Sequence, residues 1–401
     1  MLTASPLARR AAELSASFPA PHFPAELEPG VIALDSGFAS PQLLPDLSRF
    51  AVAALTRHRE ESLQYSAPQG HPALRAWLAR YMNEDGCRLE PQNVLIVNGA
   101  KHGLDLICRL LLDEGDAIVV SAPTYFSAIP IFRSFGAEFI EIGHDEHGLA
   151  VDELECVLEQ RAALRQPWPK FVYLVADFHN PTGVAMARTR REALVACAQR
   201  HGIAIVEDNP YRRVRFEGES LPTLKAFERV GEVLHVGTFS KLIAPGLRIG
   251  WIAARADWIA RLMQLKSDGG SNPLIQRMVL DFCSSEHFSA HVERVQCAYR
   301  EHRDRMVAAL RSHLPELSMD VPHGGYYLWL TLPPGVDGDE LARGAAQAGV
   351  NLIAGSRFYA SGGRQVSPCN HIRLSYSFAS PDQIEQGIRR LADVYRKQLA
   401  A

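Results

Sequence analysis

Short apolar runs recur through the first two thirds of the chain. They are four or five residues long, rich in valine, isoleucine and leucine, and occupy residues 94–97, 117–120, 171–175, 203–206, 233–236 and 249–252. A continuous apolar run of this length is typical of a strand that is buried on both faces of a sheet. Helical periodicity fills the intervals, as at residues 100–111. The alternation of buried strands with helices predicts an α/β fold with a mostly parallel central sheet.

The pattern changes after about residue 286. A long helical pattern covers residues 287–313, and it is followed by predicted strands at 326–330 and 372–375, a helix at 338–348 and a last helix from about 381. This arrangement predicts a smaller α+β domain. We therefore expect a large domain at residues 46–286 and a small domain at 287–401. The arm at residues 1–45 is expected to belong to the small domain or to lie across a partner subunit.

Composition narrows the class of protein. The chain has 401 residues, a net charge of −3 and well-mixed charges, so nothing in its electrostatics favours a nucleic acid or a membrane partner. No apolar run approaches the roughly 18 residues of a membrane-spanning helix, and the N-terminus lacks the apolar core of a signal peptide. The seven cysteines are scattered, form no C-x-x-C pair and indicate free thiols in a reducing cytoplasm rather than a metal site.

Four polar clusters follow predicted strands, where open α/β sheets bind ligands. They occupy residues 98–101, 177–183, 207–211 and 237–248. In the first cluster, Gly99, Ala100 and Lys101 open a helix, so free backbone N–H groups could receive a phosphate, although many such turns are purely structural. The second cluster contains Asn180 in a turn-forming sequence. In the third, Asp208 and Tyr211 are close enough in sequence to face one cleft.

The fourth cluster is the most informative. Lys241 stands directly after a predicted buried strand, in an apolar and hydroxyl-rich segment. Burial lowers the pKa of a lysine from its usual value of about 10.4, and Schiff-base chemistry requires the neutral amine. Thr238 and Ser240 flank this lysine, and Arg248 follows seven positions later. Together they indicate a phosphate site beside a Schiff-base lysine, in preference to a solvated surface lysine.

In this order and spacing the clusters resemble the class I and II aminotransferases, which are fold type I pyridoxal-phosphate (PLP) enzymes. The resemblance covers about residues 30–398 and is nearest to the 2-aminoadipate and kynurenine aminotransferase branch. The segments that carry it are Leu63-Gln64-Tyr65-Ser66, Ala122-Pro123-Thr124-Tyr125, Asn180-Pro181-Thr182-Gly183, Glu207-Asp208 with Tyr211, Ser240-Lys241 with Pro245-Gly246-Leu247-Arg248, and Ile372-Arg373-Leu374-Ser375-Tyr376. The resemblance implies transfer of an amino group between an α-amino acid and a 2-oxo acid by a ping-pong mechanism.

The resemblance also implies a role for each cofactor residue. Lys241 would hold PLP as a Schiff base and carry the proton at the substrate Cα. Asp208 would pair with the pyridine nitrogen, while Asn180 and Tyr211 would bond to O3′ of the ring. Tyr125 would stack on the ring face.

The remaining roles concern the phosphate and the substrate. The residues implied to hold the phosphate are Gly99, Ala100, Lys101, Thr238, Ser240 and Arg248. Tyr65 would reach the phosphate of the neighbouring subunit, so the functional unit would be a homodimer. Arg373 would bind the substrate α-carboxylate. Ser36, Gly37 and Asn180 would line the substrate pocket.

Four departures from the family pattern stand out, two at the phosphate site and two in the segments that meet the substrate. Ala100-Lys101 replaces the usual Ser-Gln pair, and Asp35-Ser36-Gly37-Phe38 stands where a Gly-Gly pair is common. Thr238 stands where serine is common. Prolines at residues 18–24 forbid a regular helix in a segment that usually helps to read the substrate side chain. That segment has no arginine for a second carboxylate, which argues against an acidic substrate such as aminoadipate.

Two other functions stay open. The same site could support elimination, replacement, cyclisation or oxidation of an amino acid, because a fold does not fix the reaction. A non-enzymatic regulator domain is a further alternative, since some bacterial regulators carry this domain behind a DNA-binding module. We expect that alternative to fail, because the match starts near residue 30 and the charge balance does not favour DNA.

Overall fold

The computed structural model describes residues 28–360 and 370–399. The predicted interruption of a helix by prolines at residues 18–24 and the predicted free thiol of Cys369 lie outside these ranges. Within them, no helix is both long enough and apolar enough to cross a bilayer.

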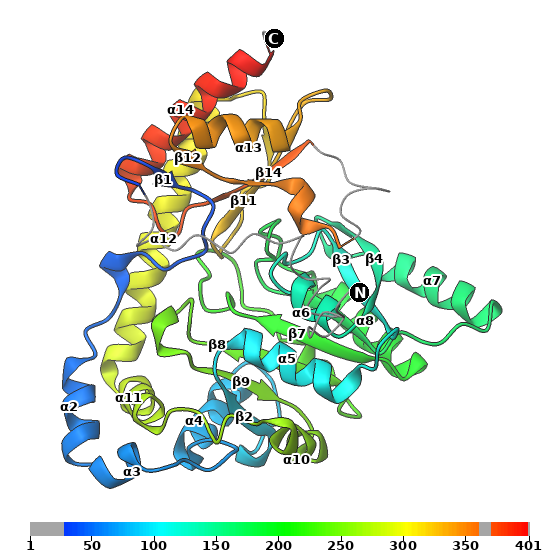
Figure 1. Cartoon of the computed structure of the whole chain (residues 1–401), viewed down its shortest axis with the longest axis vertical. Coiled ribbons are helices and arrows are strands. Elements are labelled where there is room, and N and C mark those ends of the chain that lie inside the picture. The colour runs from blue at the N-terminus through cyan, green and yellow to red at the C-terminus, as the bar shows by residue number, and fades with distance from the viewer. Residues whose placement is uncertain (1–27, 361–369, 400–401) are drawn as a thin grey trace, which may run out of the picture.

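An eight-stranded sheet forms the centre of the structure, in the order β2-β9-β8-β7-β6-β3-β4-β5 (Figure 1). Its strands are β2 (Val94–Val97), β3 (Ala117–Ala122), β4 (Glu138–Asp145), β5 (Gly148–Leu149), β6 (Phe171–Val175), β7 (Ala204–Asn209), β8 (Val233–Thr238) and β9 (Gly250–Ala253). The run from β8 to β4 is parallel, whereas β9 is antiparallel to both of its neighbours and β5 is antiparallel to β4. The predicted α/β class and mostly parallel sheet are therefore confirmed.

Helices cover both faces of this sheet. They are α4 (Pro72–Asn83), α5 (Ala100–Leu111), α6 (Ile129–Ser134), α7 (Val151–Ala163), α8 (Arg188–His201), α9 (Leu224–Phe227), α10 (Ala256–Leu265) and α11 (Pro273–Cys283). Successive side chains of the strand β3 point to opposite faces of the sheet. Val120 packs with α5 and α6 on one face, and Val119 packs with α7 and α8 on the other. Burial on both faces explains why these strands are apolar throughout.

A second, antiparallel sheet has the order β10-β11-β14-β13. It consists of β10 (Ser318–Met319), β11 (Tyr327–Thr331), β13 (Ile353–Ala354) and β14 (His371–Ser375), and it packs with α12 (Glu286–His313), α13 (Gly338–Gln347) and α14 (Pro381–Leu399). Figure 1 shows α12 running from α14 towards α11, so this helix links the two sheets. The predicted α+β character of this part is confirmed.

The N-terminal part of the described chain pairs with a strand from the C-terminal part of the chain, near the second sheet. The strand β1 (Ile32–Ala33) pairs in parallel with β12 (Val350–Asn351). Helices α2 (Ser48–Thr56) and α3 (Arg59–Leu63) follow it and pack near α11. The domain boundaries at residues 45 and 286 remain a proposal, which limited proteolysis would test.

Candidate active site

Lys241 lies in the turn that follows β8, at the carboxyl end of the parallel strands. Its Nζ donates a hydrogen bond to the carbonyl oxygen of Gly37 at 2.6 Å. Burial, followed by repulsion from Arg373 and Lys101, lowers the pKa of Lys241 to about 8. At pH 7 about a tenth of the amine is therefore neutral, against fewer than about one in a thousand for an ordinary lysine. The site thus supplies the nucleophilic form that Schiff-base formation needs.

Asp208 occupies the adjacent strand β7 and is 2% exposed. Its Oδ2 accepts a hydrogen bond from the hydroxyl of Tyr173 at 2.9 Å, but its buried Oδ1 has no partner in the described structure. Desolvation raises the pKa of Asp208 to about 6. A buried carboxylate oxygen without a hydrogen-bond donor destabilises the folded protein. We therefore expect a bound ligand to supply the donor. A protonated pyridine nitrogen is such a donor.

Arg373 in β14 is 1% exposed, and its guanidinium lies close enough to Lys241 to repel the lysine cation. Its Nη1 donates to Oδ1 of Asn180 at 2.8 Å, and its Nη2 donates to the carbonyl oxygen of Asp35. Three rings surround the guanidinium, with centroids 4.1 Å (Tyr327), 5.1 Å (Phe358) and 5.7 Å (Phe126) from Cζ. None of these groups neutralises the cation, so its charge remains available to a substrate carboxylate.

Two tyrosines that the sequence analysis placed only in a strand contact the predicted site residues. The hydroxyl of Tyr211 donates to the hydroxyl of Tyr327 at 3.1 Å, and the hydroxyl of Tyr326 donates to the carbonyl oxygen of Lys241 at 2.7 Å. A Cβ on Gly37 would lie 2.1 Å from the Tyr327 hydroxyl, so only glycine fits there. The sequence alone did not indicate this role, because two consecutive tyrosines at the start of a buried strand are also typical of a core.

The predicted phosphate residues gather at the start of α5. Gly99 is the N-cap residue with a φ of 88°, and a Cβ there would lie 2.5 Å from Nη2 of Arg248. That same Nη2 donates to the carbonyl oxygen of Asn98 at 3.0 Å. Burial and the neighbouring Arg248 lower the pKa of Lys101. A helix N-terminus with two cations that repel each other suits an anion, because an anion relieves the repulsion.

Two hydroxyls complete this group. Oγ1 of Thr238 and Oγ of Ser240 are 2.9 Å apart, and Thr238 also donates to the carbonyl oxygen of Ile249. These bonds fix the strand β8 and the turn with Lys241 against the strand β9. The hydroxyl of Ser240 is thereby held beside that of Thr238, one residue before the lysine.

The other predicted residues divide into two sets. Tyr125 lies within electrostatic range of Asp208, and burial raises the pKa of its hydroxyl. Ser36 has a buried Oγ without a partner in the described structure, next to Gly37. In contrast, Tyr65 is 89% exposed and does not join the site of its own chain.

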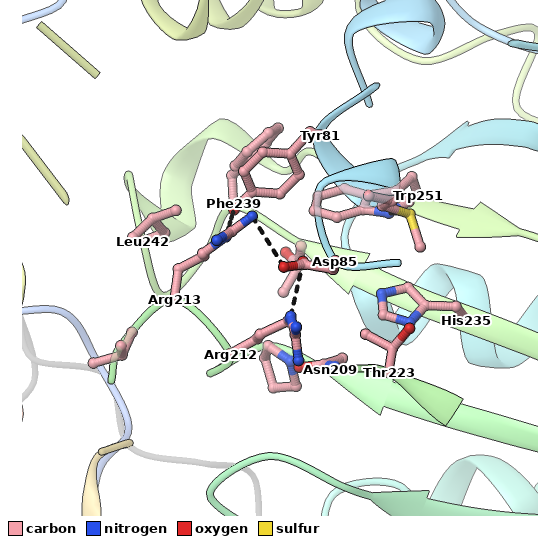
Figure 2. Close-up of a pocket in the computed structure, with 14 residues that line it drawn as sticks. Tyr81, Asp85, Asn209, Arg212, Arg213, Thr223, His235, Phe239, Leu242 and Trp251 are labelled. Carbon is pink, nitrogen blue, oxygen red and sulfur yellow. Dashed lines mark hydrogen bonds and ion pairs between the residues drawn. The ribbon is translucent and has the colours of Figure 1, made fainter. Parts of the chain in front are cut away.

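A small cavity of about 30 Å³ lies behind the site, between α4 and the turn after β7. Figure 2 shows Asp85 between the guanidinium groups of Arg212 and Arg213, at 2.8 and 3.3 Å. The cavity has room for one or two waters and is too small for a cofactor. The ion pairs around the cavity hold Arg212 and Arg213, which directly follow Tyr211. These residues therefore support the site and do not bind its ligand.

A pair of histidines supports the turn that carries Asn180. The rings of His144 and His179 stack with centroids 4.2 Å apart. Nδ1 of His179 lies 2.9 Å from Oγ1 of Thr182, and Nε2 lies 3.2 Å from Oγ of Ser121. Burial lowers the pKa of both imidazoles, to about 4 for His144. The pair is neutral near pH 7 and fixes the turn by neutral hydrogen bonds.

Comparison with known proteins identifies the family of the chain. Residues 31–391 match the family described as aminotransferase class I and II. The aromatic-amino-acid aminotransferase 1 of Thermococcus litoralis is 34% identical, over 92% of this chain and 89% of its own length. The 2-aminoadipate transaminase of Thermus thermophilus is 33% identical, over 93% of this chain and 92% of its own length.

A solved structure gives the same result. The kynurenine aminotransferase of Pyrococcus horikoshii, described in complex with PMP, superimposes with a TM-score of 0.88 and 32% identity, over 93% of this chain and 92% of its own. The residues gathered here also fit a PLP molecule, since they offer a lysine amine, a free carboxylate oxygen and an anion site. The chain belongs to the class I and II aminotransferases, which are PLP-dependent enzymes of fold type I.

Proposed function

We propose that this enzyme transfers an amino group between an α-amino acid and a 2-oxo acid by a ping-pong mechanism, with Lys241 as the lysine that holds PLP. The observation that carries the proposal is the buried Lys241, whose pKa is lowered to about 8 and which lies within electrostatic range of both Asp208 and Arg373. When bound, the cofactor supplies an electron sink for the charge that develops at the substrate Cα.

The chain's own residues would orient the cofactor. Oδ1 of Asp208, which has no partner in the described structure, would accept the pyridinium N–H. Asn180 and Tyr211 would bond to O3′ of the ring, and Tyr125 would stack on its face. The start of α5, together with the residues Thr238, Ser240 and Arg248, binds the phosphate.

The substrate would be fixed by Arg373, with Ser36 and Gly37 beside it. The guanidinium binds the α-carboxylate, and its bond to Asn180 sets its direction. The amine of Lys241 would take the proton from Cα of the amino acid in the first half of the reaction and would give a proton to the corresponding carbon of the 2-oxo acid in the second half. Because carboxylate and cofactor are both held, the bond to be broken is presented in one orientation.

We also propose that the enzyme is a homodimer. Tyr65 follows α3, and the exposed apolar side chains near it are Val52, Leu55 and Leu63. A second copy would cover these side chains and receive Tyr65 at its phosphate site. Mixing Lys241→Ala with Tyr65→Ala chains tests this proposal. Mixed dimers should regain activity through one intact site, and no recovery would contradict a shared site.

The proposed compartment is the cytoplasm, because Cys87, Cys108, Cys197 and Cys283 are buried free thiols.

The experiment that tests the reaction is a screen of amino donors by absorbance. A substrate should convert the bound cofactor to its pyridoxamine form, and a 2-oxo acid should then restore the starting spectrum. Release of ammonia without conversion of the cofactor to its pyridoxamine form would instead favour elimination. Release of hydrogen peroxide with consumption of oxygen would favour oxidation.

A further inference from the structure

Tyr173 and Asp208 form a buried pair that the sheet register creates. Val206 pairs with Tyr173 across β6 and β7, and Asp208 is two residues farther along β7. Side chains two residues apart in a strand lie on the same face, so Tyr173 and Asp208 are diagonal neighbours. The tyrosine hydroxyl donates to Oδ2 of Asp208 at 2.9 Å.

The tyrosine side is rigid. Tyr173 is fully buried, and its ring packs edge-on against Phe132 with centroids 5.0 Å apart. Burial and the nearby Asp208 raise the pKa of the Tyr173 hydroxyl well above its usual value, so the hydroxyl stays protonated and remains a donor near neutral pH. This fixed donor holds Oδ2 of Asp208, while Oδ1 has no partner among the residues that the structure describes.

We propose that Tyr173 is a positioning residue for Asp208: its hydroxyl holds Oδ2, which keeps the carboxylate ionised and leaves Oδ1 free for the pyridine nitrogen. This inference rests on the proposed PLP site, but it concerns a bond between two side chains of this chain. The acidic and basic groups within electrostatic range of Asp208 are Tyr173 from β6, Lys241 after β8, Tyr125, and His235 from β8, whose ring bonds to Glu207 on the opposite face of the sheet. Of the effects that lower the pKa of Asp208, the hydrogen bond from Tyr173 is larger than the electrostatic effect of either His235 or Lys241.

The substitution Tyr173→Phe removes the hydroxyl and keeps the ring against Phe132. The control is Tyr376→Phe, in which another buried tyrosine loses a hydrogen bond, here to the carbonyl oxygen of Gly324. The full-length chain without cofactor is labelled with ¹³C at the aspartate carboxyl carbons and titrated by NMR, and Asp208→Asn identifies the signal of Asp208.

We expect Asp208 of the wild type to titrate with a midpoint near pH 6. In Tyr173→Phe the midpoint should be higher by about one pH unit or more, which corresponds to at least about a tenfold higher proton affinity of the carboxylate. Tyr376→Phe should not move it. As a second readout, equilibrium dialysis against PLP should show that Tyr173→Phe weakens binding more at pH 6.5 than at pH 8.5. An unchanged Asp208 midpoint in folded Tyr173→Phe would overturn the inference.

If Tyr173→Phe does not fold, 3-fluorotyrosine at position 173 replaces it. Fluorine keeps the ring and makes the hydroxyl a stronger donor, so the Asp208 midpoint should fall, and an unchanged midpoint again overturns the inference. The outcomes separate the two proposals. A shifted midpoint in a protein that carries out no transamination contradicts the proposed function alone, and transamination with an unchanged midpoint contradicts only the role of Tyr173.

Discussion

Nη1 of Arg373 donates a hydrogen bond to Oδ1 of Asn180 at 2.8 Å, although the two residues are 193 positions apart in the chain. Arg373 belongs to β14 of the second sheet, and Asn180 belongs to the turn after β6 of the central sheet. The bond therefore fixes the proposed carboxylate site relative to the proposed cofactor site. The distance between these two sites determines how a substrate is presented to Lys241.

The substitution Arg373→Gln tests this relationship. Charge-assisted hydrogen bonds contribute about 1.5–3 kcal/mol each, so loss of a two-bond carboxylate clamp should lower kcat/KM for an amino acid by about 100-fold or more. An amine without a carboxylate should lose much less. The control is Arg190→Gln, which removes a partly exposed ion pair with Asp145 and should leave kcat/KM unchanged. Equal losses for both kinds of substrate would show that Arg373 is only structural.

The rate at which the cofactor-free chain captures PLP should depend on the protonation of Lys241. Its pKa is lowered to about 8, and only the neutral amine reacts. The second-order rate should rise about tenfold per pH unit up to about pH 8 and then level off, as stopped-flow absorbance would show. A rate that keeps rising beyond pH 10 would mean that the reacting amine has an ordinary pKa.

Asp208 should reduce the stability of the cofactor-free chain. The pKa of Asp208 is about 6 in the folded protein against an ordinary value of 3.8, so the ionised carboxylate is less stable in the folded chain than in the unfolded one. This destabilisation is absent below pH 3.8, where the carboxyl is protonated in both states, and it is complete above pH 6. A pKa difference of about two corresponds to about 3 kcal/mol. Asp208→Asn should therefore stabilise the cofactor-free chain by up to about 3 kcal/mol at pH 8, measured by urea unfolding, and the gain should vanish as the pH falls to 4. The exposed Asp393→Asn provides the control, and an unstabilised Asp208→Asn would contradict the prediction.

The stacked histidines should make the fold sensitive to acid. The pKa of His144 is lowered from 6.5 to about 4, so its contribution to stability is present above pH 6.5 and is lost as the pH falls through 4. His144→Phe keeps an aromatic ring on His179 and removes the titration. Its unfolding free energy should fall less between pH 6.5 and 4 than that of the wild type, by at most about 3 kcal/mol. The same acid slope in both proteins would refute this assignment, and the exposed His147→Gln serves as the control.

The sequence predicted the strands that are apolar throughout, because burial on both faces leaves a continuous run. It did not predict β4, where Glu138, Glu141, His144 and Asp145 interrupt the apolar residues. This strand lies near the edge of the sheet, next to the two-residue β5, so part of its surface is only half-buried. The short strands β1 and β12 also lacked a signal, because pairing between residues 32–33 and 350–351 depends on the tertiary fold.

The site shows a similar limit. Lys241 was predicted from its position directly after a buried strand in a hydroxyl-rich segment. Asp208 and Asn180 were predicted through the family resemblance, because a polar residue after a strand is also typical of a turn or a helix cap. Tyr173, Tyr326 and Tyr327 were not found, because a tyrosine in a strand is an ordinary core residue until its hydroxyl partner is known. The rings around Arg373 come from residues 126, 327 and 358, which only the fold brings together.

The central claim is that Lys241 carries the cofactor, and Lys101 is the rival lysine, since it lies near enough to repel Lys241. Borohydride treatment of the PLP-loaded enzyme fixes the cofactor to the lysine that holds it, and peptide mass spectrometry then locates the added pyridoxyl phosphate. The account predicts the label on the peptide that contains Lys241, and loss of both label and visible absorbance in Lys241→Ala. A label on Lys101, or a Lys241→Ala enzyme that keeps its absorbance band and full turnover, would contradict it.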